Sequence, residues 1–191
     1  MAEKKSILVL AGKAAIQDGS NIAALIKKAV LLPYTPGALL AQAEKVEGAV
    51  KAEPDRIAAE MEKASPLLLV DLVDADDAVL DAALGPILEA ADRRTLVVVA
   101  GRQVLALFGQ GITKAAEITS GADAADVIPT IAYVADVPLP PDTTAGRVLY
   151  AALKDPNARL KEIARLRESV RSMQAAMERD KPTPWGKHDC A

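Results

Sequence analysis

The sequence holds one cysteine, one histidine and 3% aromatic residues, and each shortage excludes something. A single cysteine, Cys190, excludes an internal disulfide, so we expect a protein of a reducing compartment, the cytoplasm. With so few aromatic rings, the core must be built from many small aliphatic contacts. The one histidine, His188, stands close to Cys190, and this pair is too small to form a structural zinc site without a partner chain.

Long apolar runs and clusters of positive charge are also missing. No run approaches the roughly 20 apolar residues that a membrane-spanning helix needs, and residues 7–11 form a stretch about half as long as a secretory signal core, or less. The net charge is −3, and the lysines and arginines are dispersed as far as the C-terminal helical region. We therefore expect neither a membrane nor a nucleic acid as a partner.

Short aliphatic runs alternate with helical patterns along most of the chain. Runs of this kind are typical of strands buried on both faces of a sheet, and they cover residues 6–10, 67–71, 95–99 and 104–108. The apolar spacing predicts helices over residues 21–30, 54–63, 77–91, 123–135 and 145–153. This alternation predicts an α/β fold, a doubly wound and mostly parallel sheet of about four or five strands with helices on both faces.

Beyond this region we expect a C-terminal amphipathic helical extension. The predicted boundaries are an α/β core over residues 1–154, the helix over residues 155–181 and an extended tail over residues 182–191. From Ile163 onward the apolar residues of the helix are spaced 3, 4, 3 and 4 apart, which is the heptad pattern of a coiled coil. The run is short, so two interpretations stay open: a helix packed against its own domain, or a helix pair across a dimer interface.

The predicted partner is accordingly a second copy of the chain or another protein, bound through this helix. In the tail, the single tryptophan is a candidate anchor for an apolar groove, and a disordered tail is the alternative. The candidate interaction residues are Leu160, Ile163, Leu166, Val170, Met173, Met177 and Trp185.

Five short motifs follow one another between residues 104 and 156. A predicted strand ends in a Gly-x-Gly turn at residues 109–111, Asp-Val-Ile-Pro-Thr occupies residues 126–130, and a proline-containing link covers residues 137–140. Gly-Arg-Val-Leu then occupies residues 146–149, before Ala-Leu at 152–153. This order resembles the C-terminal part of the alkaline phosphatase superfamily, especially its phosphodiesterase, sulfatase and phosphoglycerate mutase branches.

The resemblance continues upstream in looser form. Residues 67–72 would be the central strand of the family, residues 81–85 resemble its Asp-x-x-[Leu/Ile]-Gly helix, and residues 21–25 resemble its Pro-Asn-[Ile/Leu]-x-x-Leu helix. The resemblance therefore spans most of residues 6–156 and leaves out the C-terminal extension.

The resemblance implies the core of a hydrolase without its metal site. Family members hydrolyse phosphate or sulfate esters with two metal ions, held by His and Asp clusters, and a Thr, Ser or formylglycine nucleophile. At the corresponding positions this chain has residues 11–13 (Ala-Gly-Lys), Ala78 and residues 100–103 (Ala-Gly-Arg-Gln). We therefore predict a non-catalytic protein that acts through protein interaction or self-association. The alternatives are a phosphate-ester hydrolase or phosphotransferase with a reduced carboxylate site, and a small anion-binding protein.

Four aspartates cluster at the C-terminal end of the strand predicted at residues 67–71, at the sheet edge where open α/β sheets bind ligands. They are Asp71, Asp74, Asp76 and Asp77. No cofactor is expected beyond a divalent metal such as Mg²⁺, which these carboxylates would hold. In the alternative interpretation, Asp76 and Asp77 cap the following helix, while the other two are solvated or bound by backbone donors.

Three further residues are candidates for an anion site or an ion pair. Lys13 and the amides near Ser20 suggest a generic anion site at a helix N-terminus, with a plain turn as the alternative. Arg102 follows another predicted strand, where its guanidinium would pair with Asp71 or Asp74 in place of a metal, or would serve only as solubilising charge.

Overall fold

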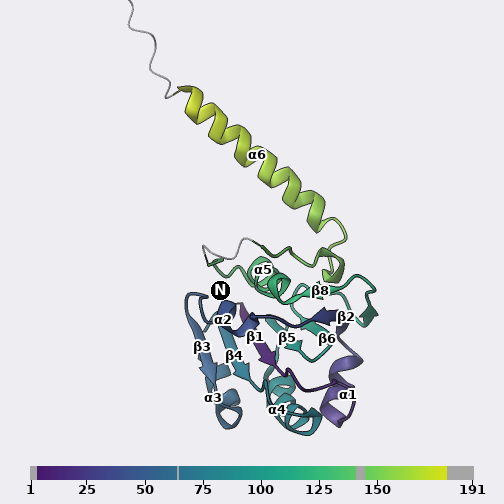
Figure 1. Ribbon diagram of the computed structural model, residues 1–191. Helices are drawn as coiled ribbons and strands as arrows, with labels where there is room; N and C mark the ends of the chain where they lie inside the picture. Colours follow the sequence, from purple (N-terminus) through teal and green to yellow (C-terminus); the bar gives the residue numbers. More distant parts are fainter. Residues whose placement is uncertain (1–3, 64, 141–144, 180–191) are drawn as a thin grey trace, which may run out of the picture. The chain divides into compact units, whose positions relative to one another are not determined.

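The computed structural model describes residues 4–63, 65–140 and 145–179, and its central element is a mixed sheet (Figure 1). The strands are β1 (Lys5–Leu10), β2 (Val30–Thr35), β3 (Ala49–Ala52), β4 (Leu67–Asp71), β5 (Thr95–Ala100), β6 (Val104–Gly109), β7 (Ala116–Glu117) and β8 (Ala122–Asp123). Their order is β3-β4-β1-β5-β6-β2-β7, and β8 pairs with β2. Most neighbours are parallel; β6 is antiparallel to both β5 and β2.

Helices cover both faces of the sheet, as the alternating pattern predicted. The helical segments of the described residues are α1 (Ser20–Ile26), α2 (Leu39–Ala43), η1 (Pro54–Arg56), α3 (Ile57–Met61), α4 (Asp77–Ala90), α5 (Ala124–Ala135), η2 (Tyr150–Ala152) and α6 (Ala158–Arg179). α1 and α3 pack beside α4 on one face, whereas α2 packs beside α5 on the other (Figure 1). The fold class is therefore α/β.

The strands β1, β4, β5 and β6 contain unbroken runs of apolar residues because both of their faces are covered. In β1, Ile7 and Val9 join the core cluster that includes residues of α1, α3 and α4. Leu8 and Leu10 point to the opposite face, where α5 packs, and both are buried. All six residues of β5 are buried as well. This arrangement explains why the runs lack the polar alternation of a half-exposed strand.

The sheet has more strands than the four or five expected. The four predicted runs are β1, β4, β5 and β6, whereas β2, β3, β7 and β8 were not predicted. β2 contains Pro33, which cannot donate a ladder hydrogen bond, and its first residue, Val30, falls within the helix predicted over residues 21–30. The other three are two to four residues long, too short to show a period.

Three predicted helices are shorter than their patterns. The helix expected over residues 21–30 ends at Ile26, and the segment over residues 54–63 is divided into η1 and α3. Within residues 145–153 the only helical turn is η2. α1 also begins after Gly19 and not after Ser20: Gly19 has φ +142°, a backbone angle that glycine adopts without the steric cost of a Cβ.

The chain divides into two compact units at the junction between Asp155 and Pro156. The first holds the sheet and its helices, and the described part of the second consists mainly of α6. α6 lies within the predicted helix of residues 155–181. Among the described residues, no helix combines the length and the apolar character that crossing a membrane requires.

Candidate functional site

The loops after β1, β4 and β5 meet at one edge of the sheet because these parallel strands end level with one another. Leu10 pairs with Asp71 on one side and with Ala100 on the other. The loops touch closely: a Cβ on Gly12 would lie 3.3 Å from the Val73 carbonyl oxygen. This edge is where the sequence placed its candidate metal and anion sites.

Two of the four candidate aspartates form ion pairs with lysines. The Nζ of Lys51, on β3, lies 2.8 Å from a carboxylate oxygen of Asp71. The hydrogen bond from Lys51 lowers the pKa of Asp71, and the same bond raises the pKa of Lys51. The Nζ of Lys13 lies 2.7 Å from Asp74, and both of these side chains are exposed. Nothing in the sequence pattern pointed to Lys51, because β3 itself was not predicted.

The other two candidate aspartates bind backbone amides. Asp76 is the N-cap of α4 and accepts a hydrogen bond from the Val79 amide at 3.1 Å. Asp77 reaches the loop before α1 and accepts hydrogen bonds from four consecutive amides, those of residues 15–18, at distances of 2.7 to 3.1 Å. Burial raises the pKa of Asp77, but the four amides together outweigh it, so that the pKa is lowered.

One turn further along α4, Asp81 binds backbone amides at the start of α1. Its carboxylate accepts hydrogen bonds from the amides of Asn21 and Ile22, each at 2.8 Å. Asp77 and Asp81 are four residues apart and therefore lie on one face of α4, which is the signal that could have identified them as a pair. The loop of residues 15–18 is thus an anion-binding loop whose anion is the chain's own carboxylate.

The candidate residues of this edge therefore have separate partners. Lys13 pairs with Asp74, and the amides that follow Ser20 are bound by Asp81. Arg102 donates its backbone amide to the Ala14 carbonyl, while lysines hold the two carboxylates with which its guanidinium was expected to pair. Within the described ranges, no group of three or more His, Cys, Asp or Glu side chains is placed to hold a metal ion. An open depression remains, lined by Leu40 and residues 71–75.

The motifs at residues 126–130 and 146–149 dock against each other. Asp126 is 4% exposed and accepts hydrogen bonds from the backbone amides of Asp123 and Arg147 at 3.1 and 2.9 Å. The Thr130 hydroxyl, also buried, accepts the Leu149 amide at 3.0 Å. A Cβ on Gly146 would lie 1.8 Å from a carbonyl oxygen of α5, so this position requires glycine. These polar residues hold a connecting segment against α5, a structural role.

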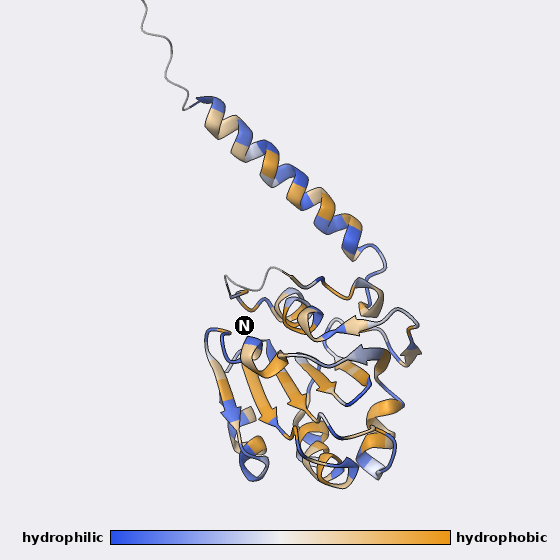
Figure 2. Cartoon of the chain, viewed as in Figure 1, coloured by the Kyte–Doolittle hydropathy of each residue, from blue (hydrophilic) through white to orange (hydrophobic). Residues whose placement is uncertain are grey.

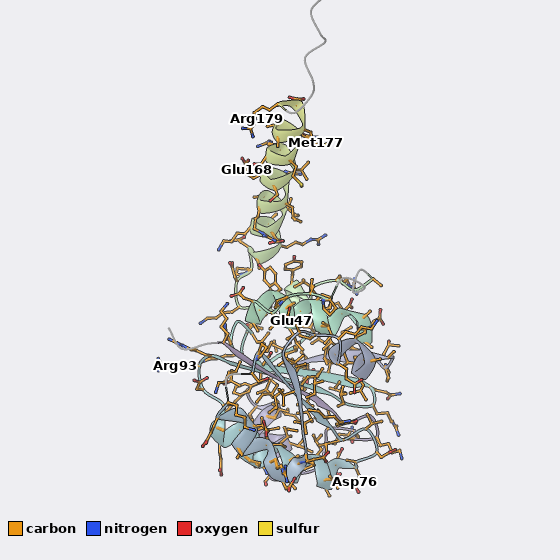
Figure 3. All side chains as sticks on the ribbon, turned by 90° about the vertical axis from the view of Figure 1, so that its left-hand side faces the viewer. Glu47, Asp76, Arg93, Glu168, Met177 and Arg179 are labelled. Atoms are coloured by element: carbon orange, nitrogen blue, oxygen red, sulfur yellow. The ribbon has the colours of Figure 1, made fainter. Side chains whose placement is uncertain are left out.

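α6 carries the candidate interaction residues. Its six large apolar side chains are all exposed, from 37% for Ile163 to 71% for Met177. Coloured by hydropathy, the helix shows apolar residues interspersed with hydrophilic ones along its whole length (Figure 2). Figure 3 shows Met177 on one side of the helix and Glu168 on the other. α6 is therefore an amphipathic helix with an apolar stripe at coiled-coil spacing, and we call these six residues the α6 stripe: Leu160, Ile163, Leu166, Val170, Met173 and Met177.

Other candidates lie outside the described residues. Trp185, the proposed tail anchor, is one of them, as are His188 and Cys190. Comparison of the sequence with family models and with curated proteins finds no match in either. Two regions of the molecule therefore bear on its function, the sheet edge and the α6 stripe.

Proposed function

We propose that this chain is a non-catalytic protein that works by self-association, with α6 as the associating element. The observation that carries the proposal is the α6 stripe, six large apolar side chains aligned on one helix and all exposed. A single helix cannot remove its own stripe from water, and burial of each such side chain contributes about 1.5–3 kcal/mol. The stripe thus favours a partner surface of the same kind.

The sheet edge supports the non-catalytic part of the proposal. A carboxylate metal site needs several oxygens directed at one point. Here Asp71 and Asp74 bind lysines, Asp76 caps α4, and Asp77 is surrounded by four amides. An anion-binding function has less support for the same reason, because Asp77 already fills the amide-rich loop.

The core that we propose is alkaline-phosphatase-like. In support, the motifs at residues 126–130 and 146–149 come together in space as well as in order, and the contact between them uses Asp126, Thr130, Gly146 and Arg147. Residues that keep a fold in place without touching a reaction centre are what a scaffold derived from an enzyme would retain. With one cysteine in 191 residues, we also propose a cytoplasmic location.

Sedimentation velocity of the full chain over a range of concentrations tests self-association. We expect wild-type protein to reach twice the chain mass of 20.0 kDa. Val170→Glu places a charge in the α6 stripe and should leave the protein monomeric at concentrations where the wild type is dimeric. Ser172→Glu adds the same charge on the opposite side of the helix and should keep the dimer. A wild-type chain that is monomeric at every concentration would overturn the proposal.

A separate assay tests the absence of catalysis. Purified protein should not hydrolyse generic phosphate monoesters or diesters in the presence of Mg²⁺, Mn²⁺ or Zn²⁺. Turnover that is lost in Asp74→Ala would replace our proposal with the hydrolase interpretation, because the Asp74 side chain is 88% exposed and its substitution should leave the fold intact.

A further inference from the structure

We propose that two copies of α6 associate as a parallel, in-register, two-stranded coiled coil; this inference rests on the self-association proposed above. The spacing of the stripe fixes the heptad positions. Ile163, Val170 and Met177 fall at position a, and Leu166 and Met173 fall at position d. Leu160 falls at position e, beside the seam, and so widens the stripe at its N-terminal end.

The residue types at these positions favour two strands. In parallel coiled coils, β-branched residues at a combined with leucine at d favour dimers over trimers and tetramers. α6 has Ile163 and Val170 at a, with Leu166 at d between them. The two methionines extend the seam toward the end of the helix, and their unbranched, flexible side chains can pack in a dimer or in a larger bundle. The central part of the stripe therefore specifies the number of strands.

The charges beside the seam favour the parallel orientation. Glu162 is at position g and Arg167 is at position e of the next heptad, the two positions that meet across a parallel dimer. Two such pairs would form, one on each side of the seam. In an antiparallel pair, g faces g and e faces e, so these opposite charges could not meet. The sequence thus provides attraction for one orientation and none for the other.

An existing contact within the helix is compatible with this pairing. Arg165 donates from Nε and Nη2 to the two carboxylate oxygens of Glu162, at 2.9 and 2.6 Å. The resulting fall in the pKa of Glu162 keeps its carboxylate ionised. Each carboxylate oxygen can accept more than one hydrogen bond, so Glu162 can also accept from Arg167 of a second copy. Arg165 itself is at position c, away from the seam.

The opposite side of the helix has the character of a solvent-facing surface. Glu168 and Arg171, at positions f and b, form an ion pair with 3.6 Å between Oε2 and Nη1, and both side chains are exposed. Ala164 and Ala175, at b and f, are small residues that cannot anchor a partner. One stripe for one partner is the arrangement of a dimer, since a larger bundle would need apolar residues over a wider part of the helix.

Disulfide cross-linking of the full chain tests the orientation. In a Cys190→Ser background, Met177→Cys should form a cross-linked dimer under mild oxidation, because equivalent a positions adjoin in a parallel pair. Ser172→Cys, on the outer side, is the matched control and should not cross-link at dilute protein concentration. In an antiparallel pair, a positions pack opposite d positions; with Ile163 opposite Met173, two copies of residue 177 would be separated along the axis by about 27 Å, too far for a disulfide.

Exchange of the flanking charges provides a second measurement. Glu162→Arg or Arg167→Glu alone should weaken the dimer about tenfold, and the double variant should recover the wild-type dissociation constant. An equimolar mixture of the two single variants should form heterodimers in preference to homodimers. Each pair in that mixed dimer is again one of opposite charges, provided that the chains are parallel.

The possible outcomes separate this inference from the function on which it rests. Cross-linking through residue 177, with recovery in the double charge variant, supports the parallel dimer. A dimer that cross-links only when Ile163→Cys is mixed with Met173→Cys is antiparallel, because a positions pack opposite d positions in that orientation; this result overturns the inference and leaves self-association intact. A wild-type chain without any dimer overturns both.

Discussion

In β5 all six side chains are buried, whereas in α6 the single buried residue is Ala158 and every large apolar side chain is exposed. Both elements contain large aliphatic residues, but β5 has no charged residue, whereas arginine, lysine and glutamate separate the apolar positions of α6. The difference lies in what surrounds them. The sheet is covered by helices on both faces, so its apolar side chains are buried. The apolar side chains of α6 are exposed, and only another molecule or another part of the chain could bury them.

The charged residues of the two regions also differ in where their partners lie. At the sheet edge, the carboxylates are bound by lysines or by backbone amides of the same unit, as in the four hydrogen bonds to Asp77. On α6, the flanking charges Glu162 and Arg167 stand at positions that a second helix would bring together. The carboxylates of the sheet edge therefore have partners within their own unit, whereas the charges beside the α6 stripe are placed as they would be in a helix–helix interface.

The largest expected effect comes from the core. Leu84 lies on α4, is fully buried, and belongs to the main hydrophobic cluster. Leu84→Ala should lower the free energy of unfolding by about 2–5 kcal/mol, because it removes buried methyl groups and leaves a cavity. Urea denaturation followed by circular dichroism measures the loss. A change below about 0.5 kcal/mol would mean that the core is not packed as described and would break the comparison.

A smaller effect is expected at the sheet edge. Asp77→Asn should lower the free energy of unfolding at pH 7 by about 1–2 kcal/mol, because an amide side chain cannot accept from all four backbone donors. Asp76→Asn is the matched control. Asparagine is as good an N-cap as aspartate, so this substitution should change the free energy of unfolding by less than about 0.5 kcal/mol.

The stabilisation by Asp77 should also depend on pH. Because the folded-state pKa of Asp77 is lowered, its contribution is present above the unfolded-state pKa of about 3.9 and is lost as pH falls through the lower folded-state value. The difference between wild type and Asp77→Asn should thus be full at pH 7 and shrink as the pH falls below about 4. An equal difference at pH 7 and at the acid end of the titration would show that the charge of Asp77 is not what stabilises the loop.

The parts of the fold that could be predicted from the sequence are those with a long, uniform pattern. The strands buried on both faces stand out as unbroken aliphatic runs, and the stripe of α4 spans its whole length, so both were found close to their observed ends. β2 and β3 were missed because neither has such a pattern. β2 contains Pro33 and follows α1 closely, and β3 is only four residues long.

The candidate site shows the same limit. That Asp71, Asp74, Asp76 and Asp77 gather near the end of β4 follows from the sequence, but their partners do not. Whether a carboxylate holds a metal or a backbone loop depends on which donors the fold brings to it. Ile16, one of the four donors to Asp77, has φ +58°, a turn that no glycine or asparagine at that position announced. The α6 stripe was easier to identify, since all of its residues lie on one helix.

The smallest expected effect on core stability is that of a leucine on α6. Leu166 is 51% exposed, and Leu166→Ala should change the free energy of unfolding of the core by less than about 0.5 kcal/mol when the chain is dilute enough to be monomeric. At concentrations where the wild type is dimeric, the same substitution should raise the dissociation constant about tenfold, because Leu166 occupies a d position of the seam. Sedimentation velocity and urea denaturation on the same samples separate the two effects. If Leu166→Ala instead destabilises the monomer as Leu84→Ala does, the α6 stripe packs against its own core, and the contrast between the two regions disappears.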